Sequence, residues 1–332
     1  MLLFIFFLCL FLRSHSGELS KDDPEYEYYS HYNPLMIISA QQTKSFIINS
    51  FKIPHISCRT SYCNPSMTPW YFTKIGSDDN SKSPPFFVTW SNDDKRWGNY
   101  YMIIQFDKDG NNLIVLKNPD TFEIFDDSTG AGRRPFNCEA ARDMRIYSIP
   151  HSATHDSSHD NHRQYRIAYW SNSPTRMMEQ RFTNVYYSQS MDALYVLQPF
   201  TKIDGEHEFG HKHEKNWSPF LHLNNVSGAY DNLFVYSIFP HRIVHPSKSA
   251  HNITQGYTKL LVAKAHVVAT STEPNKLFQN SWEKKFGEIH GGSPAVLVDT
   301  QYGPRYLTFF HSNRQGYMVR IVHILLLYHL NE

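Results

Sequence analysis

The sequence predicts an all-β chain folded as a β-propeller. Aromatic residues make up 15% of the 332 residues, with 21 Tyr and 23 Phe, and such side chains suit the half-buried surface of a sheet. Short apolar runs also alternate with clusters of Asn, Asp, Gly and Pro, a pattern typical of strands joined by turns. A chain of this length holds one large all-β domain or two ordinary domains.

Residues 1–16 are predicted to be a cleaved secretory signal peptide. The apolar run over 2–12 is shorter than the roughly 20 residues that span a bilayer, and small polar residues follow it. Because no basic residue precedes this run, an uncleaved anchor remains the alternative. The protein is therefore expected in the secretory pathway, either secreted or, if the segment is retained, in the lumen of the endoplasmic reticulum or Golgi.

Acceptor patterns for N-glycosylation fit this route. Asn225 and Asn252 each begin an Asn-X-Ser/Thr pattern, so the protein is expected to be a glycoprotein. Asn216 also begins such a pattern, but we expect this residue to belong to a binding pocket instead.

The propeller is predicted to occupy residues 34–315, after an exposed, tyrosine-rich lead-in at 17–33. The best helical candidate, 175–182, has good helix formers but no apolar stripe. Residues 316–332 are predicted to form an atypical tail, because most of this segment lacks the alternation of a strand. The expected strands lie at 46–53, 70–75, 86–90, 100–106, 113–116, 145–149, 165–170, 184–187, 193–197 and 233–238.

A loose internal repeat favours the propeller. Aromatic strands end near Trp90, Trp170, Tyr236 and Phe310, at intervals of 80, 66 and 74 residues, and a serine follows each within two residues. Strand-rich units that repeat at this scale are typical of propeller blades with insertions. A large β-sandwich whose strand ends are merely alike is the alternative.

The composition excludes some classes of partner. The net charge is +1 and no block of Lys and Arg occurs, so no nucleic acid is expected to bind. Cys58 and Cys63 are close enough for a small disulfide, which leaves Cys138 without a pair, and no C-x-x-C motif suggests a zinc ribbon. We expect no metal, no cofactor and no stable protein partner.

One literal motif suggests a zinc metallopeptidase. The segment His207-Glu208-Phe209-Gly210-His211 matches H-E-x-x-H, in which two histidines on one helix bind zinc. The helical context is missing, because a glycine lies inside the segment and no apolar stripe accompanies it. The peptidase is therefore a less favoured alternative.

The run from 213 to 220 is predicted to form the wall of a carbohydrate-sized pocket. It places charges, an amide and an indole together, and an apolar strand follows at 233–238, as in a binding loop mounted on a sheet. The alternative is a surface loop whose tryptophan fills the core. Candidate substrate-binding residues in and after this run are Glu214, Lys215, Asn216, Trp217, Tyr236 and His241.

Carboxylates elsewhere in the chain have the chemistry for glycosyl transfer. Such transfer needs an acid that protonates the leaving oxygen, and a second carboxylate or an incoming anion at the anomeric carbon. Asp93, Asp94 and Asp143 are the candidate catalytic residues, and Arg145 and His311 are further candidates for binding substrate. In a propeller, the inner strand ends of all blades converge on the central channel, where we expect these groups to meet.

Three segments, taken in order, resemble a known family. They are 142–146 (RDMRI), 214–220 (EKNWSPF) and 291–311, which begins with Gly-Gly-Ser-Pro and ends in Phe-Phe-His. Together they resemble the five-bladed propellers of the β-mannoside phosphorylases and their β-1,2-mannosidase and β-1,2-mannosyltransferase relatives, over about 86–312. The resemblance implies a five-bladed β-propeller, and its last blade is expected to be incomplete because little of the chain after His311 has a strand pattern. Asn216 stands where bacterial members often have an aspartate.

The resemblance implies a carbohydrate-active protein that acts on β-linked mannosides or related sugars, as a glycosidase, a phosphorylase or a glycosyltransferase. It implies that Arg145 and Lys215 contact phosphate or sugar and that His311 closes the last matched strand. It also implies a general acid at Asp93 or Asp94. The partner is then a carbohydrate or a sugar phosphate, and a non-catalytic carbohydrate-binding propeller is the alternative.

Overall fold

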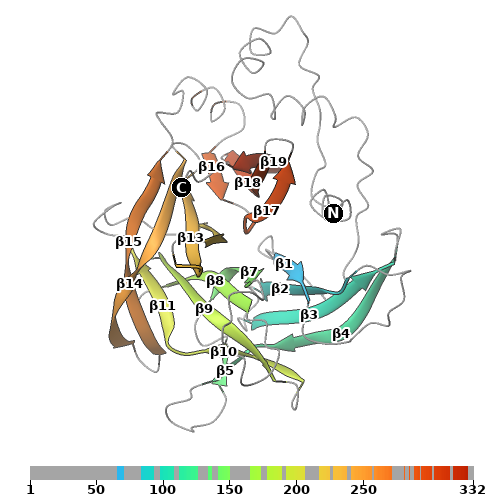
Figure 1. Cartoon of the computed structure of the whole chain (residues 1–332). Coiled ribbons are helices and arrows are strands. Elements are labelled where there is room, and N and C mark those ends of the chain that lie inside the picture. Colours follow the sequence, from blue (N-terminus) through green and yellow to red (C-terminus); the bar gives the residue numbers. More distant parts are fainter. Residues whose placement is uncertain are drawn as a thin grey trace, which may run out of the picture. The chain divides into compact units, whose positions relative to one another are not determined.

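The computed structural model (Figure 1) is almost entirely β in the residues that it describes, which confirms the all-β class. The chain divides into two compact units, Met1–Lys52 with Ile238–Pro240 and Thr272–Glu332, and Ile53–Ser237 with His241–Ser271. Within the described residues, no helix has the length and apolar character needed to cross a membrane. The structure describes residues 66–70, 84–92, 98–107, 112–125, 134–136, 141–149, 165–172, 178–188, 192–205, 217–224, 227–237, 241–255, 258–270, 280, 284, 288–291, 293–300, 303–314 and 317–327.

The first sheet is a four-stranded antiparallel meander. Its strands follow chain order: β1 (Ser66–Pro69), β2 (Phe86–Asn92), β3 (Gly98–Phe106) and β4 (Leu113–Thr121). The central strands β2 and β3 are nearly continuous apolar runs and are buried, as expected for strands covered on both faces. The outer strand β4 carries Lys, Asn, Asp and Thr and is largely half-buried or exposed.

A second meander contains β7 (Arg142–Ser148), β8 (Tyr165–Asn172) and β9 (Met178–Ser188). Two shorter strands, β10 (Ala193–Leu197) and β11 (Phe200–Asp204), share the next position and both pair antiparallel with β9. The position is therefore a single edge of β9 divided into two parts.

A third meander runs through β12 (Ser218–Leu223), β13 (Tyr230–Ser237), β14 (Arg242–Gln255) and β15 (Thr258–Thr270). Parallel pairing of β15 with β11 joins the third meander to the second. On the other side, β10 pairs in parallel with β5 (Glu123–Phe125), which pairs with β6 (Arg134–Pro135). These strands form one curled eleven-stranded sheet within the described residues (Figure 1).

The compact unit that includes Thr272–Glu332 contains a separate four-stranded antiparallel sheet. Here β16 (Glu288–Gly291) and β17 (Val296–Thr300) pair with one edge of β18 (Gly303–Arg314), and β19 (Tyr317–Leu327) pairs with its other edge. Most of the segment predicted to be an atypical tail is thus a strand. This segment forms a strand because it pairs with β18, although its sequence lacks the alternation typical of a strand.

The internal repeat corresponds to one recurring position in these meanders. Trp90 lies in β2, Trp170 in β8, Tyr236 in β13 and Phe310 in β18, and each of these strands is paired on both edges. The parallel pairing of β15 with β11 places the second and third meanders in one sheet. The described residues therefore show the all-β class and recurring antiparallel meanders, and five separate blades remain a prediction.

Most expected strands coincide with observed ones, notably 86–90, 100–106 and 193–197. The helical candidate 175–182 is wrong from Met178 onward, where the chain forms β9. Pairing with strands on both edges of β9 outweighs the helix propensity of Met and Glu, because propensity is a weak preference. The strand expected at 46–53, the predicted signal peptide and the lead-in lie outside the described residues.

Among the described residues, two apolar clusters stabilise the unit formed by Ile53–Ser237 and His241–Ser271. In the larger one, Trp70 stacks on Tyr165 at 5.9 Å between ring centroids and meets the edges of Phe87 and Tyr187 at 5.5 and 5.2 Å. The smaller cluster surrounds Trp217 and includes Phe234, Val244 and Ala168. Alternate residues of β8 belong to different clusters, because successive side chains of a strand point to opposite faces.

Candidate functional site

A β-bulge in β7 forms the centre of the candidate site. Arg142 pairs with Trp170 and Arg145 pairs with Ala168, so β7 has one more residue than β8 over this stretch. Asp143 lies in the bulge with a φ of 49°, in the left-handed region. Aspartate visits this region more readily than most residues, and bulges redirect side chains near functional sites. We call this stretch the Asp143 bulge.

Both residues at the start of the bulge contact Trp170. The indole Nε1 of Trp170 donates a hydrogen bond of 2.7 Å to Asp143 Oδ2. The guanidinium carbon of Arg142 lies 5.0 Å from the centroid of the Trp170 ring, within reach of a cation–π interaction. Trp170 is only 7% exposed, whereas Asp143 and Arg142 are half-buried. The indole therefore orients a carboxylate and a guanidinium that solvent still reaches.

Arg145 brings a buried positive charge to the same strand. Its Nη1 donates a hydrogen bond of 2.5 Å to the backbone oxygen of Trp217. Burial lowers the pKa of Arg145 to about 10, and the negative charge of Asp143 acts in the opposite direction. The guanidinium remains charged at neutral pH and links the bulge to the start of β12.

Trp217 is the buried support of this site. It is 1% exposed and packs edge-on against Phe234 and Tyr236, at 6.0 and 5.2 Å between ring centroids. Tyr236 is half-buried. Four of the residues chosen from the sequence thus lie in one connected region: Asp143, Arg145, Trp217 and Tyr236.

A buried polar pair on the same strands was not chosen from the sequence. Tyr147 OH donates a hydrogen bond of 2.7 Å to Asn232 Oδ1. Burial raises the pKa of Tyr147, so the hydroxyl stays protonated. No motif in the sequence singled out Asn232. Arg142 and Trp170 were likewise visible in motifs without being chosen as site residues.

Two of the remaining candidates are histidines in the described structure. His241 precedes β14, and burial lowers its pKa to about 4, so its ring is neutral at pH 7. His311 lies on β18 in the other compact unit, opposite His290 and Val322 in register. Five candidates lie outside the described residues: Asp93, Asp94, Glu214, Lys215 and Asn216.

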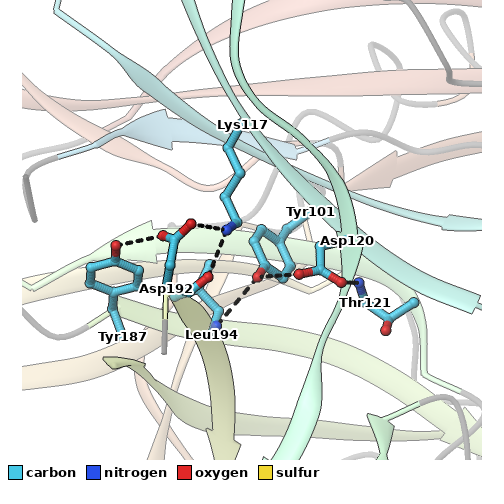
Figure 2. A network of polar contacts seen from close by, with 7 residues as sticks. All are labelled: Tyr101, Lys117, Asp120, Thr121, Tyr187, Asp192 and Leu194. Carbon is cyan, nitrogen blue, oxygen red and sulfur yellow. Dashed lines mark hydrogen bonds and ion pairs between the residues drawn. The ribbon is translucent and has the colours of Figure 1, made fainter. Parts of the chain in front are cut away.

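A second polar network joins the first sheet to the turn between β9 and β10 (Figure 2). Lys117 Nζ on β4 donates to both the backbone oxygen and Oδ2 of Asp192, each at 2.6 Å. Tyr187 OH donates to Asp192 Oδ1 at 2.7 Å. Burial of Asp192 opposes ionisation, but its bonds to Lys117 and Tyr187 and the charge of Lys117 together lower its pKa below the usual value. We call this network the Asp192 clamp.

Tyr101 extends the network within the first sheet. Its hydroxyl donates to Asp120 Oδ2 at 3.2 Å and accepts a bond from the backbone nitrogen of Leu194 at 3.4 Å (Figure 2). Burial, and then the charge of Asp120, raise the pKa of Tyr101. The side chains of Tyr101, Lys117 and Tyr187 each bond to an aspartate of the same fold, so we interpret this network as structural.

No group of three or more His, Cys, Asp or Glu side chains in the described part of the chain is placed to hold a metal ion. The H-E-x-x-H segment at 207–211 lies outside the described residues. No protein-family model matches the chain, and no curated protein matches its sequence.

Proposed function

We propose that the protein is a secretory, carbohydrate-active protein that binds β-linked mannosides or related sugars at the Asp143 bulge. The proposal includes a five-bladed propeller, to which the antiparallel meanders would contribute blades. The main support is the carboxylate of Asp143, oriented by Trp170 and flanked along β7 by Arg142 and Arg145.

The chemistry of the bulge suits a sugar or a sugar phosphate. Sugar hydroxyls both donate and accept hydrogen bonds, a carboxylate accepts them, and a guanidinium donates them to hydroxyl or phosphate oxygens. Asp143 and Arg142 are accessible enough to make such bonds. Trp170 is too buried to stack on a sugar ring, so we assign it a positioning role, whereas half-buried Tyr236 offers an aromatic surface.

The described geometry supports binding more directly than turnover. Glycosyl transfer needs a second carboxylate or an incoming anion beside the acid. Asp93, Asp94 and Glu214, the candidates for that second carboxylate, lie outside the described residues. A protein that binds sugars without acting on them is therefore the second candidate function. Among the candidate catalytic carboxylates, Asp143 is the one that the described residues include.

The test compares two aspartates that both have positive φ. Asp143→Asn keeps a side chain that tolerates positive φ but removes the charge, and Asp192→Asn makes the same change in the Asp192 clamp. Hydrogen bonds to charged groups contribute about 1.5–3 kcal/mol, so Asp143→Asn should weaken sugar binding by roughly tenfold or more. Asp192→Asn should leave binding unchanged.

The measurement is calorimetric titration of the purified chain with β-mannosides, mannose phosphates and nucleotide sugars, followed by assays for turnover of each compound that binds. Turnover that Asp143→Asn abolishes would favour an enzyme, and binding without turnover would favour the second candidate. Equal affinity in the parent and both variants, with native circular dichroism, would contradict the assignment of the site to the bulge.

A further inference from the structure

We propose that Asn252 carries an N-linked glycan and that this glycan covers an edge of the eleven-stranded sheet with which no further described strand pairs. The proposal is independent of sugar binding at the Asp143 bulge. It rests instead on the secretory route expected from residues 1–16 and on the geometry of β14.

The second half of β14 is an edge strand. β14 pairs with β13 only through residues 242–244, whereas residues 250–255 pair with β15 alone among the described strands. The opposite edge of β15 is occupied by β11 over residues 260–264. Residues 250–255 therefore end the sheet at this level.

This edge is open to solvent on both faces. Residues 250–254 are all exposed, and Ile253 is one of the exposed large apolar side chains, at 37%. An exposed edge strand offers unpaired backbone groups to another chain, and natural proteins usually protect such edges with charges, proline, bulges or covering segments. The stretch Ala250-His251-Asn252-Ile253-Thr254 contains no proline and no permanently charged residue.

Asn252 is placed to accept a glycan. Its side chain and that of Thr254 are exposed on an extended strand, and no described residue forms a hydrogen bond with the Asn252 amide. The pattern at Asn216 differs, because Trp217 and Ser218 are 1% and 0% exposed. A bulky hydrophilic group fits the exposed surface at Asn252, whereas the second and third residues of the pattern that begins at Asn216 are buried.

The modification transfers an oligosaccharide from a polyprenyl diphosphate donor in the secretory lumen. Asn252 Nδ2 forms a bond to the anomeric carbon, and the bond from that carbon to the diphosphate oxygen breaks. The lipid diphosphate leaves with the bonding electrons, and the amide nitrogen loses one proton. The product is a neutral N-glycosidic amide, so the charge of the edge is unchanged while its bulk and hydration increase.

Glycopeptide mapping of the full chain secreted by a eukaryotic host tests the modification. Enzymatic removal of N-glycans in heavy-oxygen water should convert Asn252 to labelled aspartate. Asn252→Gln and Thr254→Ala should each remove one glycan from the intact mass, and Thr254→Ser should retain it, because serine also completes the acceptor pattern. Asn216→Gln, the matched control, should leave the mass of attached glycan unchanged.

Two outcomes would overturn the proposal. One is a secreted chain in which Asn252 is unmodified, and the other is a chain that stays outside the secretory route and carries no glycan. Loss of a glycan on Asn216→Gln would contradict the structural distinction between the two patterns.

Light scattering during size-exclusion chromatography tests the role of the edge. Asn252→Gln should shift the chain toward larger species as its concentration rises. Adding Ile253→Lys to that variant should restore the parent profile, because a charged side chain also protects an edge. If Asn252→Gln behaves like the parent at every concentration, the glycan does not protect the edge, and that part of the proposal fails.

Discussion

Asp143 and Asp192 are the two non-glycine residues with positive φ in the described part of the chain, at 49° and 47°. Each accepts a 2.7 Å hydrogen bond from an aromatic side chain, Trp170 in one case and Tyr187 in the other. The two aspartates differ in the cation nearby. Asp192 is 61% exposed and binds Lys117 from a neighbouring sheet, whereas Asp143 interacts with Arg145, which is buried on its own strand.

This difference shows that one local conformation can serve two purposes. In the Asp192 clamp, the carboxylate fastens a turn to the first sheet, and water screens much of the charge interaction. At the Asp143 bulge, the carboxylate lies near a guanidinium that is largely removed from water, where charge interactions are stronger. The surroundings, rather than the positive φ itself, make Asp143 the better candidate for a binding group.

The largest expected effect comes from the support beneath the bulge. Trp217→Ala should lower the free energy of unfolding by about 3–5 kcal/mol, because it removes a fully buried aromatic side chain. It should also weaken sugar binding at Asp143, since the buried indole holds in place the backbone oxygen of Trp217 that accepts the bond from Arg145. Urea unfolding measures the first effect.

Tyr187→Phe is the matched variant in the Asp192 clamp. It removes only the hydroxyl that binds Asp192, so it should cost about 1 kcal/mol. If Tyr187→Phe and Trp217→Ala lowered the free energy of unfolding by similar amounts, the buried indole of Trp217 would not support the bulge as described.

A smaller, pH-dependent effect is expected from His241, which follows the strand that carries Tyr236. Burial lowers the pKa of the His241 ring to about 4, whereas an unfolded histidine has a pKa near 6.5. Between these values the unfolded state binds more protons, so the free energy of unfolding should fall as the pH drops, by up to about 3 kcal/mol. His241→Gln should lack this component, and urea unfolding at a series of pH values measures it. Identical pH profiles for parent and variant would show that His241 is not shielded from protonation.

The smallest effect is expected in the Asp192 clamp. Lys117→Met should destabilise the fold by about 0–1 kcal/mol at pH 7, because Asp192 is mostly exposed. The pKa of Asp192 is lowered in the fold, so its contribution is present above the unfolded pKa and is lost as the pH falls below it. The difference between parent and variant should therefore shrink in acid.

Lys264→Met is the control for the clamp, because it makes the same change in net charge at an exposed lysine. An equal loss of stability in the two lysine variants would mean that the contact with Asp192 contributes nothing specific.

The sequence alone determined the all-β fold class and the places where similar strands recur along the chain. Aromatic and β-branched runs of strand length, bounded by turn residues, are local properties, and they predicted strands such as 100–106 and 193–197. The repeat around Trp90 and Trp170 was also visible, because equivalent strand positions select similar residues. The error at 175–182 arose where local helix propensity disagreed with the sheet that surrounds β9.

Only the tertiary structure decided which polar residues meet. Asp143 lies 27 positions from Trp170, and Arg145 lies 72 positions from Trp217. The first contact depends on the register of β7 with β8 and on one inserted residue, and the second depends on how β7 lies against the start of β12. Moving a strand by one residue turns each of its side chains to the other face of the sheet. The sequence pattern of a single segment therefore does not determine which polar residues of different strands are in contact. The bulge that holds Asp143 is a property of the assembled sheet.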